Sequence, residues 1–334
     1  MKHDQLIDHP AVLAVFGIVV VAMLLLDLGI FNKHSHVVSN KEALTWSIVW
    51  IGLSMLFSGV VYYTMDFDAF SKFQSAYWIE KALSVDNLFV FIMVFGFFNV
   101  PKHLHHKVLF WGIIGALFFR AIFIFTGAGL IKLTFLPPFK LFGHLVEDVN
   151  VILTLFGIFL IVAGIKSWRA HEDTDENKDF TKSPGARIVH KFFNVTKNFE
   201  GSKFFVKVNG ARLATPLLVV VAVIEFTDLI FAVDSIPAIF AIAPNDSFIL
   251  YTSNIFAILG LRALYFLLAN FMYMFSKLHY GLALILAFIG IKMLINPFIH
   301  ISSPVSLAVV GGILLGAVIA SFAFPAKQEA AKHN

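Results

Sequence analysis

Residues 215–242 read TPLLVVVAVIEFTDLIFAVDSIPAIFAI, an apolar run longer than the roughly 20 helical residues that cross a bilayer. Three acidic side chains, Glu225, Asp228 and Asp234, lie within it. A carboxylate at the centre of a bilayer is costly, so acids in such a run are expected to face the interior of a helical bundle. The stretch predicts a membrane-spanning helix whose carboxylates have a structural or functional role.

The whole chain has the composition of an integral membrane protein. Of its 334 residues, 59% are hydrophobic and 14% are charged, and the mean hydropathy is +0.84. The chain has no cysteine, which excludes disulfides, thiolate metal sites and iron-sulfur clusters. Its net charge of +4 does not indicate nucleic-acid binding, because the basic residues lie in the gaps between apolar runs.

The apolar runs predict an all-α fold, a polytopic transmembrane helical bundle with nine spans. No small-residue cleavage pattern follows the first run, so we expect a retained span rather than a signal peptide. The expected spans are 11–31, 43–64, 77–98, 108–131, 149–166, 215–242, 248–273, 281–295 and 304–324.

Basic residues concentrate in every second gap, as is typical of cytoplasmic loops. Lys33 and Lys41 lie in the first gap, Lys102 and Lys107 lie in the third, and the long fifth gap is strongly basic. We therefore expect the N-terminus outside and the C-terminus in the cytoplasm. The expected organisation is a first span (1–31), a second span with its loops (32–76), three spans (77–167), a cytoplasmic linker (168–213), three spans (214–296), and a ninth span with the C-terminal tail (297–334).

The two groups of three spans share a sequence pattern. Residues 80–87 read EKALSVDN in the third span, and residues 228–235 read DLIFAVDS in the sixth. Two further pairs follow in the same order: IGALFFRA (114–121) with AILGLRA (257–263), and VAGIK (162–166) with FIGIK (288–292). Because each unit has three spans, the second copy enters the bilayer from the opposite side. Such inverted repeats are typical of secondary transporters, with the substrate site near the midplane.

The oxygen-bearing side chains of these spans are candidate ligands for a hard divalent cation such as magnesium, calcium or manganese. On one ideal helix, six residues separate two side chains by about 9 Å in rise and about 120° in direction. A compact site then needs ligands from both repeats, or a local break in the helix such as Pro237 offers. The candidate ligands are Glu80, Asp86, Asn87, Glu225, Asp228 and Asp234, with Asp27 and Ser235 as additional candidates.

A structural interpretation of the same acids stands beside this one. Lys81, Arg120, Arg262 and Lys292 also lie in or at the ends of spans, so some carboxylates are explained as partners in buried ion pairs. The cluster His103, His105 and His106 is interpreted as part of a solvated basic loop. The sequence contains no nucleophile elbow, phosphate-binding loop or zinc-protease motif, so we do not expect an enzyme.

The sequence resembles the TerC family of integral membrane proteins, and most of all its Alx branch. The resemblance lies in residues 80–87 and 225–238 and is supported by residues 252–263 and by Tyr280 and Gly281. It implies a nine-span protein of the bacterial inner membrane that exports manganese, with the two acidic motifs forming the metal pathway. No permanently bound cofactor is implied; manganese(II) is the transported ion.

Several questions stay open at this level. Desolvated carboxyls bind protons more readily, so protons are the candidate counter-ion of a cation antiporter, with the lipid bilayer as the other expected partner. A membrane scaffold, in which the linker docks a partner and the charges only lock helices together, is the alternative, as is a component of tellurium resistance. Metal selectivity, transport direction and oligomeric state are not fixed by the sequence.

Overall fold

The structure is a computed structural model of the whole chain. It describes residues 14–23, 38–141, 144–146, 149–169, 179–208, 210–244, 246–271 and 278–323. The candidate ligand Asp27 lies outside these residues. Asp86 and Asp234 are described in their backbone positions, but their side chains lie outside the description.

Helices dominate the described chain. After a short apolar helix, Ala14–Met23, the elements follow in this order: α3 (Asn40–Thr64), α4 (Phe67–Phe97), α5 (Lys102–Leu133), β1 (Phe139–Leu141), β2 (His144–Val146), α6 (Val151–Arg169), η2 (Phe180–Lys182), α7 (Pro184–Phe192), β3 (Phe205–Val208), β4 (Ala211–Ala214), α8 (Pro216–Phe240), α9 (Ser247–Leu259), α10 (Leu261–Phe271), α11 (Leu278–Ile295) and α12 (Ser303–Ala323).

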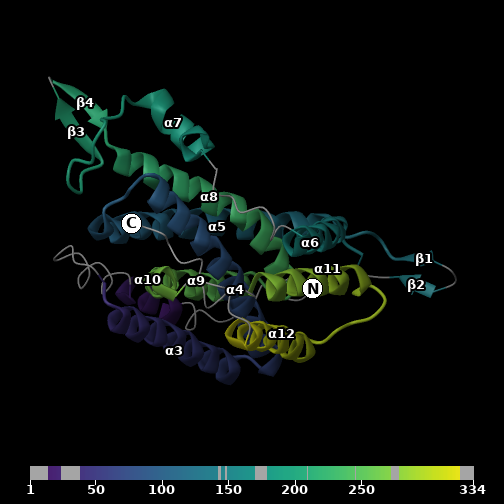
Figure 1. The fold of residues 1–334 in the computed structure, drawn as a ribbon. Coiled ribbons are helices and arrows are strands. Elements are labelled where there is room, and N and C mark those ends of the chain that lie inside the picture. The colour runs from purple at the N-terminus through teal and green to yellow at the C-terminus, as the bar shows by residue number, and fades with distance from the viewer. Residues whose placement is uncertain are drawn as a thin grey trace.

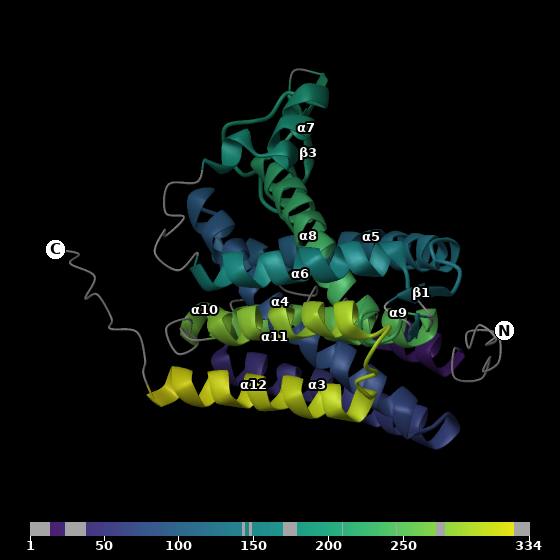
Figure 2. The ribbon, with the colours of Figure 1, turned by 90° about the vertical axis from the view of Figure 1, so that its right-hand side faces the viewer.

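The long helices form a layered bundle. Figures 1 and 2 show α5, α6 and α8 on one side, α4, α9, α10 and α11 in the middle, and α3 and α12 on the other side. The middle layer is therefore covered on both faces, and α9 is buried along its length. This arrangement accounts for the all-α fold expected from the sequence.

A described helix lies at each of the nine expected spans, but six helical segments are long and apolar enough to count as candidate spans. They are α3, α5, α6, α8, the α9 and α10 segment, and α12; the helix Ala14–Met23 and α11 are apolar but shorter. The remaining helix, α4, carries the charged residues Glu80, Lys81 and Asp86 in its apolar stretch. The chain is thus a polytopic membrane protein by its helices, and the count of nine spans stays a prediction.

Three helical features differ from the sequence-based expectations. Helix α4 begins at Phe67 rather than near residue 77, because the Oδ1 atom of Asp66 accepts a hydrogen bond from the backbone N–H of Ala69 at 2.6 Å and caps the helix. The seventh span is two helices, α9 and α10, that meet at Gly260. Helix α8 runs through Pro237 to Phe240, so the helix break proposed there was wrong.

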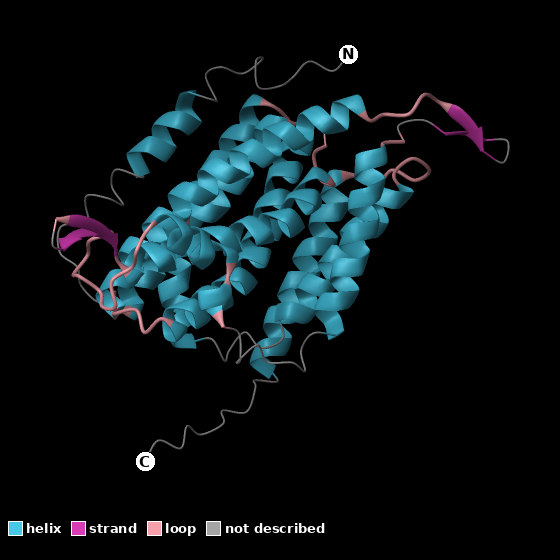
Figure 3. Cartoon of the chain, turned by 90° about the horizontal axis from the view of Figure 1, so that it is seen from above, coloured by secondary structure: helices cyan, strands magenta, loops and turns pink. Residues whose placement is uncertain are grey.

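Two antiparallel strand pairs extend the helical fold. Strands β1 and β2 lie between α5 and α6, and β3 and β4 precede α8. Figure 3 shows the two pairs at opposite ends of the bundle. The expected linker, 168–213, thus contains folded structure: a 3-10 turn, α7 and the hairpin β3–β4.

Helices α6 and α11, which carry the matched segments 162–166 and 288–292, pack with their backbones close together. A Cβ atom at Gly290 would lie 2.6 Å from the carbonyl oxygen of Gly157, and one at Gly164 would lie 2.8 Å from the carbonyl oxygen of Ala283. Small residues permit such close approach between membrane helices, which associate mainly through van der Waals contact.

Candidate functional site

The candidate site centres on Arg120, which lies near the middle of α5 with 1% of its surface exposed. Its guanidinium donates a short hydrogen bond to Glu80 Oε1 on α4. It also lies 3.4 Å from Asp228 Oδ1 and 3.3 Å from Ser235 Oγ, both on α8. One arginine therefore joins the two acidic motifs, from the first and second halves of the chain, at mid-helix.

The cluster contains two acidic side chains and one basic side chain. Glu80 and Asp228 are 0% and 6% exposed, and one guanidinium offsets one of their two charges when both are ionised. Ser84 Oγ donates to Glu80 Oε1 at 3.2 Å, but Glu80 Oε2 accepts no hydrogen bond from the described residues. Since buried polar atoms are normally satisfied, this oxygen is a candidate binding atom for a cation, a proton or water.

Glu225 lies beside the cluster without joining the Arg120 ion pair. It precedes Asp228 by three residues and therefore shares a face of α8 with it. Its carboxylate lies directly against α5 at Gly115, where an added Cβ atom would be 1.8 Å from Glu225 Oε2. That oxygen is buried and has no hydrogen-bond partner among the described residues. Glu225 is thus a second carboxylate with an unused oxygen.

The other basic candidates occupy different places. Lys81 Nζ donates to the carbonyl oxygen of Ala257 on α9 at 3.2 Å, and it is 7% exposed. Lys292 is buried near the end of α11, where Lys72 and Asp68 of α4 are the charged groups nearby. Neither lysine has a described hydrogen bond or ion pair with Glu80 or Asp228 at the Arg120 cluster.

A cavity adjoins the cluster and reaches Asp228. Apolar side chains from α4, α5, α8, α9 and α10 line it together with Asp228 and Arg262, and its atom-free space, mouth included, is about 330 Å³. The lining includes Phe91 in the second half of α4 and Leu109 in the first half of α5. The cavity therefore lies between Asp228 and the end of the bundle where α4 passes into α5.

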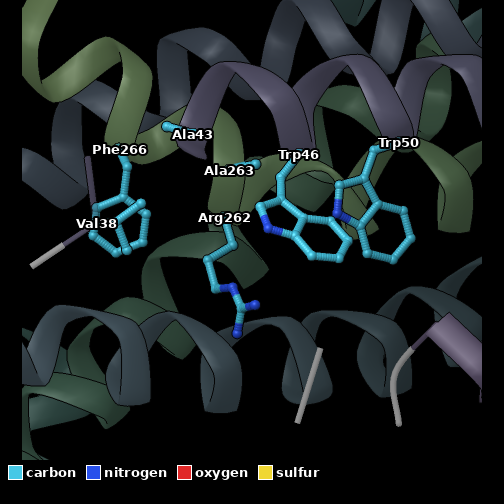
Figure 4. A pocket seen from close by; sticks show the side chains of 7 residues that line it. All are labelled: Val38, Ala43, Trp46, Trp50, Arg262, Ala263 and Phe266. Carbon is cyan, nitrogen blue, oxygen red and sulfur yellow. The ribbon is translucent and has the colours of Figure 1, made fainter. Parts of the chain in front are cut away.

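Arg262 lines a second pocket as well, between α3 and α10. Figure 4 shows Trp46 and Trp50 along α3 and the guanidinium of Arg262 extending away from α10. Because it borders both cavities, Arg262 lies between the pocket formed by α3 and α10 and the cavity beside Asp228. The structure thus places the two matched arginines, Arg120 and Arg262, in different surroundings.

The aspartates Asp86 and Asp234 follow Glu80 and Asp228 by six residues, a rise of about 9 Å along each helix. The end of α4 and the start of α5 lie beside the segment that leads into α8. The ring centroids of Phe97 and Phe180 are 5.4 Å apart, and Lys107 donates to the carbonyl of Ser202. The two helices therefore run in opposite directions. Asp86 is displaced from the cluster toward the linker end of the bundle, and Asp234 toward the opposite end.

The remaining candidates are placed as follows. Asn87 is buried on α4, with 9% of its surface exposed. His105 Nε2 donates to the Val100 carbonyl at 2.9 Å, and its Nδ1 lies 3.0 Å from the Tyr265 hydroxyl, so His105 has a packing role rather than a place in a solvated loop. Among the side chains that the structure describes, no three acids or histidines gather as a metal-binding group.

Sequence reasoning missed two contributors to the site and one further buried polar residue. Ser84 lies inside the first motif but was given no role, and Gly115 makes the space for Glu225. Asn254 on α9 is 1% exposed, and both of its amide atoms lack a described hydrogen-bond partner. A polar residue amid the apolar run 247–259 was the signal for Asn254; no signal in the sequence marks the approach of Gly115 to Glu225.

Comparison with known proteins supplies the family. The model of the TerC family of integral membrane proteins matches residues 65–329. An "Uncharacterized membrane protein STKORF319" of Myxococcus xanthus is 41% identical over 317 residues, covering 94% of this chain and 93% of its own length. The "Putative membrane-bound redox modulator Alx" of Escherichia coli K12 is 44% identical over 310 residues, or 90% of each chain. No solved structure matches. With a family model that spans most of the chain and relatives of this identity along nearly its whole length, the chain belongs to the TerC family.

Proposed function

We propose that this protein is a secondary transporter that exports hard divalent cations, manganese first among them, from the cytoplasm across the bacterial inner membrane. The observation that carries the proposal is the meeting of the two acidic motifs at Arg120, near the middle of three helices. Buried ionisable groups at such depth are rare and mark ion pathways in membrane proteins. A scaffold has no comparable need for acids of both halves at one level.

The chemistry of the donors supports the substrate class. Apart from the guanidinium of Arg120, every polar group at the cluster is an oxygen that could bind a metal ion. The chain has no cysteine and therefore no thiolate ligand. Carboxylate, hydroxyl and amide oxygens suit manganese, magnesium and calcium better than copper(I). The "redox modulator" in the name of the Escherichia coli relative describes a role that this chain would have to fulfil without a cysteine.

The two displaced aspartates mark the two ends of the proposed pathway. The basic linker indicates that the end where α8 begins is cytoplasmic, so Asp86 lies on the cytoplasmic side of the cluster and Asp234 on the outer side. A cation enters through the cavity beside Asp228 on the side of Asp86, passes the cluster, and leaves on the side of Asp234. Arg120 supplies positive charge between the acids when no cation is bound.

Protons complete the cycle as the proposed counter-ion. A carboxyl removed from water holds a proton more readily, so the acids that release a cation are suited to take up protons in exchange. The unpartnered oxygens of Glu80 and Glu225 are the places where such protons would bind.

Metal binding by the purified protein tests this function before any transport is measured. A cation that binds the folded state at 100 times its dissociation constant stabilises it by about 2.7 kcal/mol. We expect manganese to raise the unfolding temperature of the wild type in detergent, and Asp86→Asn to reduce the rise. Glu200→Gln, which removes an exposed acid of the linker, is the matched control and should behave as wild type.

The same titration is repeated with magnesium, calcium and zinc. A larger shift with manganese than with the other cations supports the proposed substrate. No shift with any of the four would contradict a cation site in this protein.

A further inference from the structure

Helix α7, in the segment that leads into α8, lies outside the layered bundle. Figures 1 and 2 show it along the flank of α8, near the hairpin β3–β4. Its inner face packs closely: Gly185, Ala186 and Val189 are buried, and a Cβ atom at Gly185 would lie 2.3 Å from the carbonyl oxygen of Ala222. We call residues 179–214 the linker module.

The contact with α8 shows how far along that helix α7 lies. Ala222 lies six residues after Pro216, so it is about 9 Å along the helix axis from the start of α8. Helix α8 is long and apolar enough to cross a membrane. Amphipathic helices at a membrane surface bury their apolar face about 5–10 Å into the boundary between headgroups and acyl chains. With the start of α8 at the membrane surface, α7 lies at the depth of that boundary.

Two large apolar side chains are exposed on the outer side of α7. Ile188 and Phe192 are 50% and 69% exposed, and because they are four residues apart they lie on one face of the helix. In a protein surrounded by water such a pair would be unfavourably hydrated. Beside the first turns of a membrane-spanning helix it matches the acyl chains of the lipid.

The charged side chains of the linker module favour an anionic surface. Seven basic side chains are exposed against two acidic ones, Asp179 and Glu200. Asp179 is anionic at neutral pH, since hydrogen bonds from Thr181 and Lys182 lower its pKa. The basic residues are Lys182, Arg187, Lys191, Lys197, Lys203, Lys207 and Arg212. Basic residues close to an anionic leaflet are attracted to its headgroups.

We propose that the linker module is a lipid-binding surface, in which Ile188 and Phe192 insert among acyl chains while Arg187 and Lys191 bind the phosphates of anionic phospholipids. Contacts within the protein hold the module in place for this. Lys107 of α5 lies over the ring of Phe204 at 4.6 Å, and Thr215 Oγ1 donates to the carbonyl of Lys203 at 2.7 Å. The inference does not depend on the transported ion.

The absence of cysteine from the chain allows a direct test, because any cysteine introduced is unique. Phe192→Cys and, as an exposed control in the same module, Asn198→Cys carry a nitroxide spin label in the full-length protein in vesicles. Collision rates with oxygen, which concentrates in lipid, are compared with those of a water-soluble nickel chelate. In vesicles of phosphatidylcholine mixed with phosphatidylglycerol, we expect oxygen to dominate at position 192 and the nickel chelate at position 198.

The two positions and two vesicle types make the result decisive. An aqueous profile at position 192 like that at 198 would overturn the proposal and favour a docking site for a soluble protein. Equal immersion in pure phosphatidylcholine would overturn the role of anionic headgroups. Adding Arg187→Gln and Lys191→Gln should weaken immersion in the mixed vesicles, and Ile188→Cys provides a second labelled position if Phe192→Cys fails to fold.

Discussion

At the scale of single residues, the missing side chain of Gly115 decides where the carboxylate of Glu225 lies. The two residues come from α5 and α8, far apart in sequence, and the carboxylate occupies the space that a Cβ atom would fill. Gly129, on the same helix, has no atom within 4 Å of its Cβ position. The two glycines are therefore a matched pair for substitution.

We expect Gly115→Ala to displace the Glu225 carboxylate and to reduce cation flux by about tenfold, because small displacements of a functional group have effects of this order or larger. Gly129→Ala should leave flux unchanged. In a protein that already carries Glu225→Ala, the Gly115→Ala change should add nothing, since the clash is gone. Additive losses in that double variant, measured in vesicles, would contradict the assigned contact.

Arg120 is the residue on which the cluster depends for stability. Arg120→Gln leaves Glu80 and Asp228 buried without their cation, and breaking a buried ion pair on one side costs about 3–5 kcal/mol. We expect a correspondingly lower unfolding temperature in detergent, and recovery of most of the loss when Glu80→Gln and Asp228→Asn are added. Arg169→Gln, at the exposed arginine that ends α6, is the control. An Arg120→Gln protein as stable as wild type would show that the ion pairs contribute little to the free energy of unfolding.

The sequence predicted which residues form the cluster better than it predicted which of them pair with one another. Acids and arginines within apolar runs are rare, so Glu80, Asp228 and Arg120 could be selected from their positions in the sequence. Which acid pairs with which base depends on helix rotation and on the crossing of α4, α5 and α8, which no local pattern encodes. Arg120 and Arg262 match in the repeat, yet the first joins Glu80 to Asp228 and the second borders two cavities.

At the scale of elements, the helix boundaries followed local chemistry that hydropathy does not measure. The cap at Asp66 lengthens α4 beyond its apolar part, and Gly260 separates α9 from α10 within one apolar run. Pro237 lacks an N–H but its ring does not end α8, because the helix is held by packing on its neighbours. The helices themselves were predictable from apolar runs; their ends required caps and tertiary contacts.

The pair α6 and α11 gives an element-scale prediction. Gly290→Ala places a methyl group against the backbone of Gly157 and Ile161, so we expect a loss of about 1–3 kcal/mol, the usual cost of overpacking. Gly312→Ala on α12 meets open space and should leave stability nearly unchanged. The unfolding temperatures of the two variants in detergent provide the comparison. Equal values would show that the two helices can separate at little cost.

At the scale of the whole molecule, the opposite directions of α4 and α8 agree with the inverted arrangement expected from the two motifs. The matched segments 80–87 and 228–235 run antiparallel, and Asp86 and Asp234 lie to either side of the Arg120 cluster. Membership of the TerC family was predictable from these motifs. The repeat as a whole and the nine spans remain predictions, since they concern the relation of complete three-helix units and a bilayer.

Topology is testable with cysteines placed at the two ends. Leu136 lies between α5 and β1, and Val208 lies at the end of β3; both are exposed and the two strand pairs occupy opposite ends of the bundle. We expect a membrane-impermeant maleimide to label Leu136→Cys in intact cells and Val208→Cys only after the membrane is opened. The reverse pattern would place the linker module outside and would exchange the entry and exit ends of the proposed pathway.

Manganese flux in sealed vesicles tests the central claim most directly. The wild type, Asp86→Asn, Asp234→Asn and the control Glu200→Gln are reconstituted, manganese is imposed on one side, and internal metal and pH are recorded together. The account predicts manganese movement with an opposing proton signal in the wild type and in Glu200→Gln, and the loss of both signals in each aspartate variant. Folded wild-type protein that moves neither manganese nor any of magnesium, calcium and zinc would contradict it.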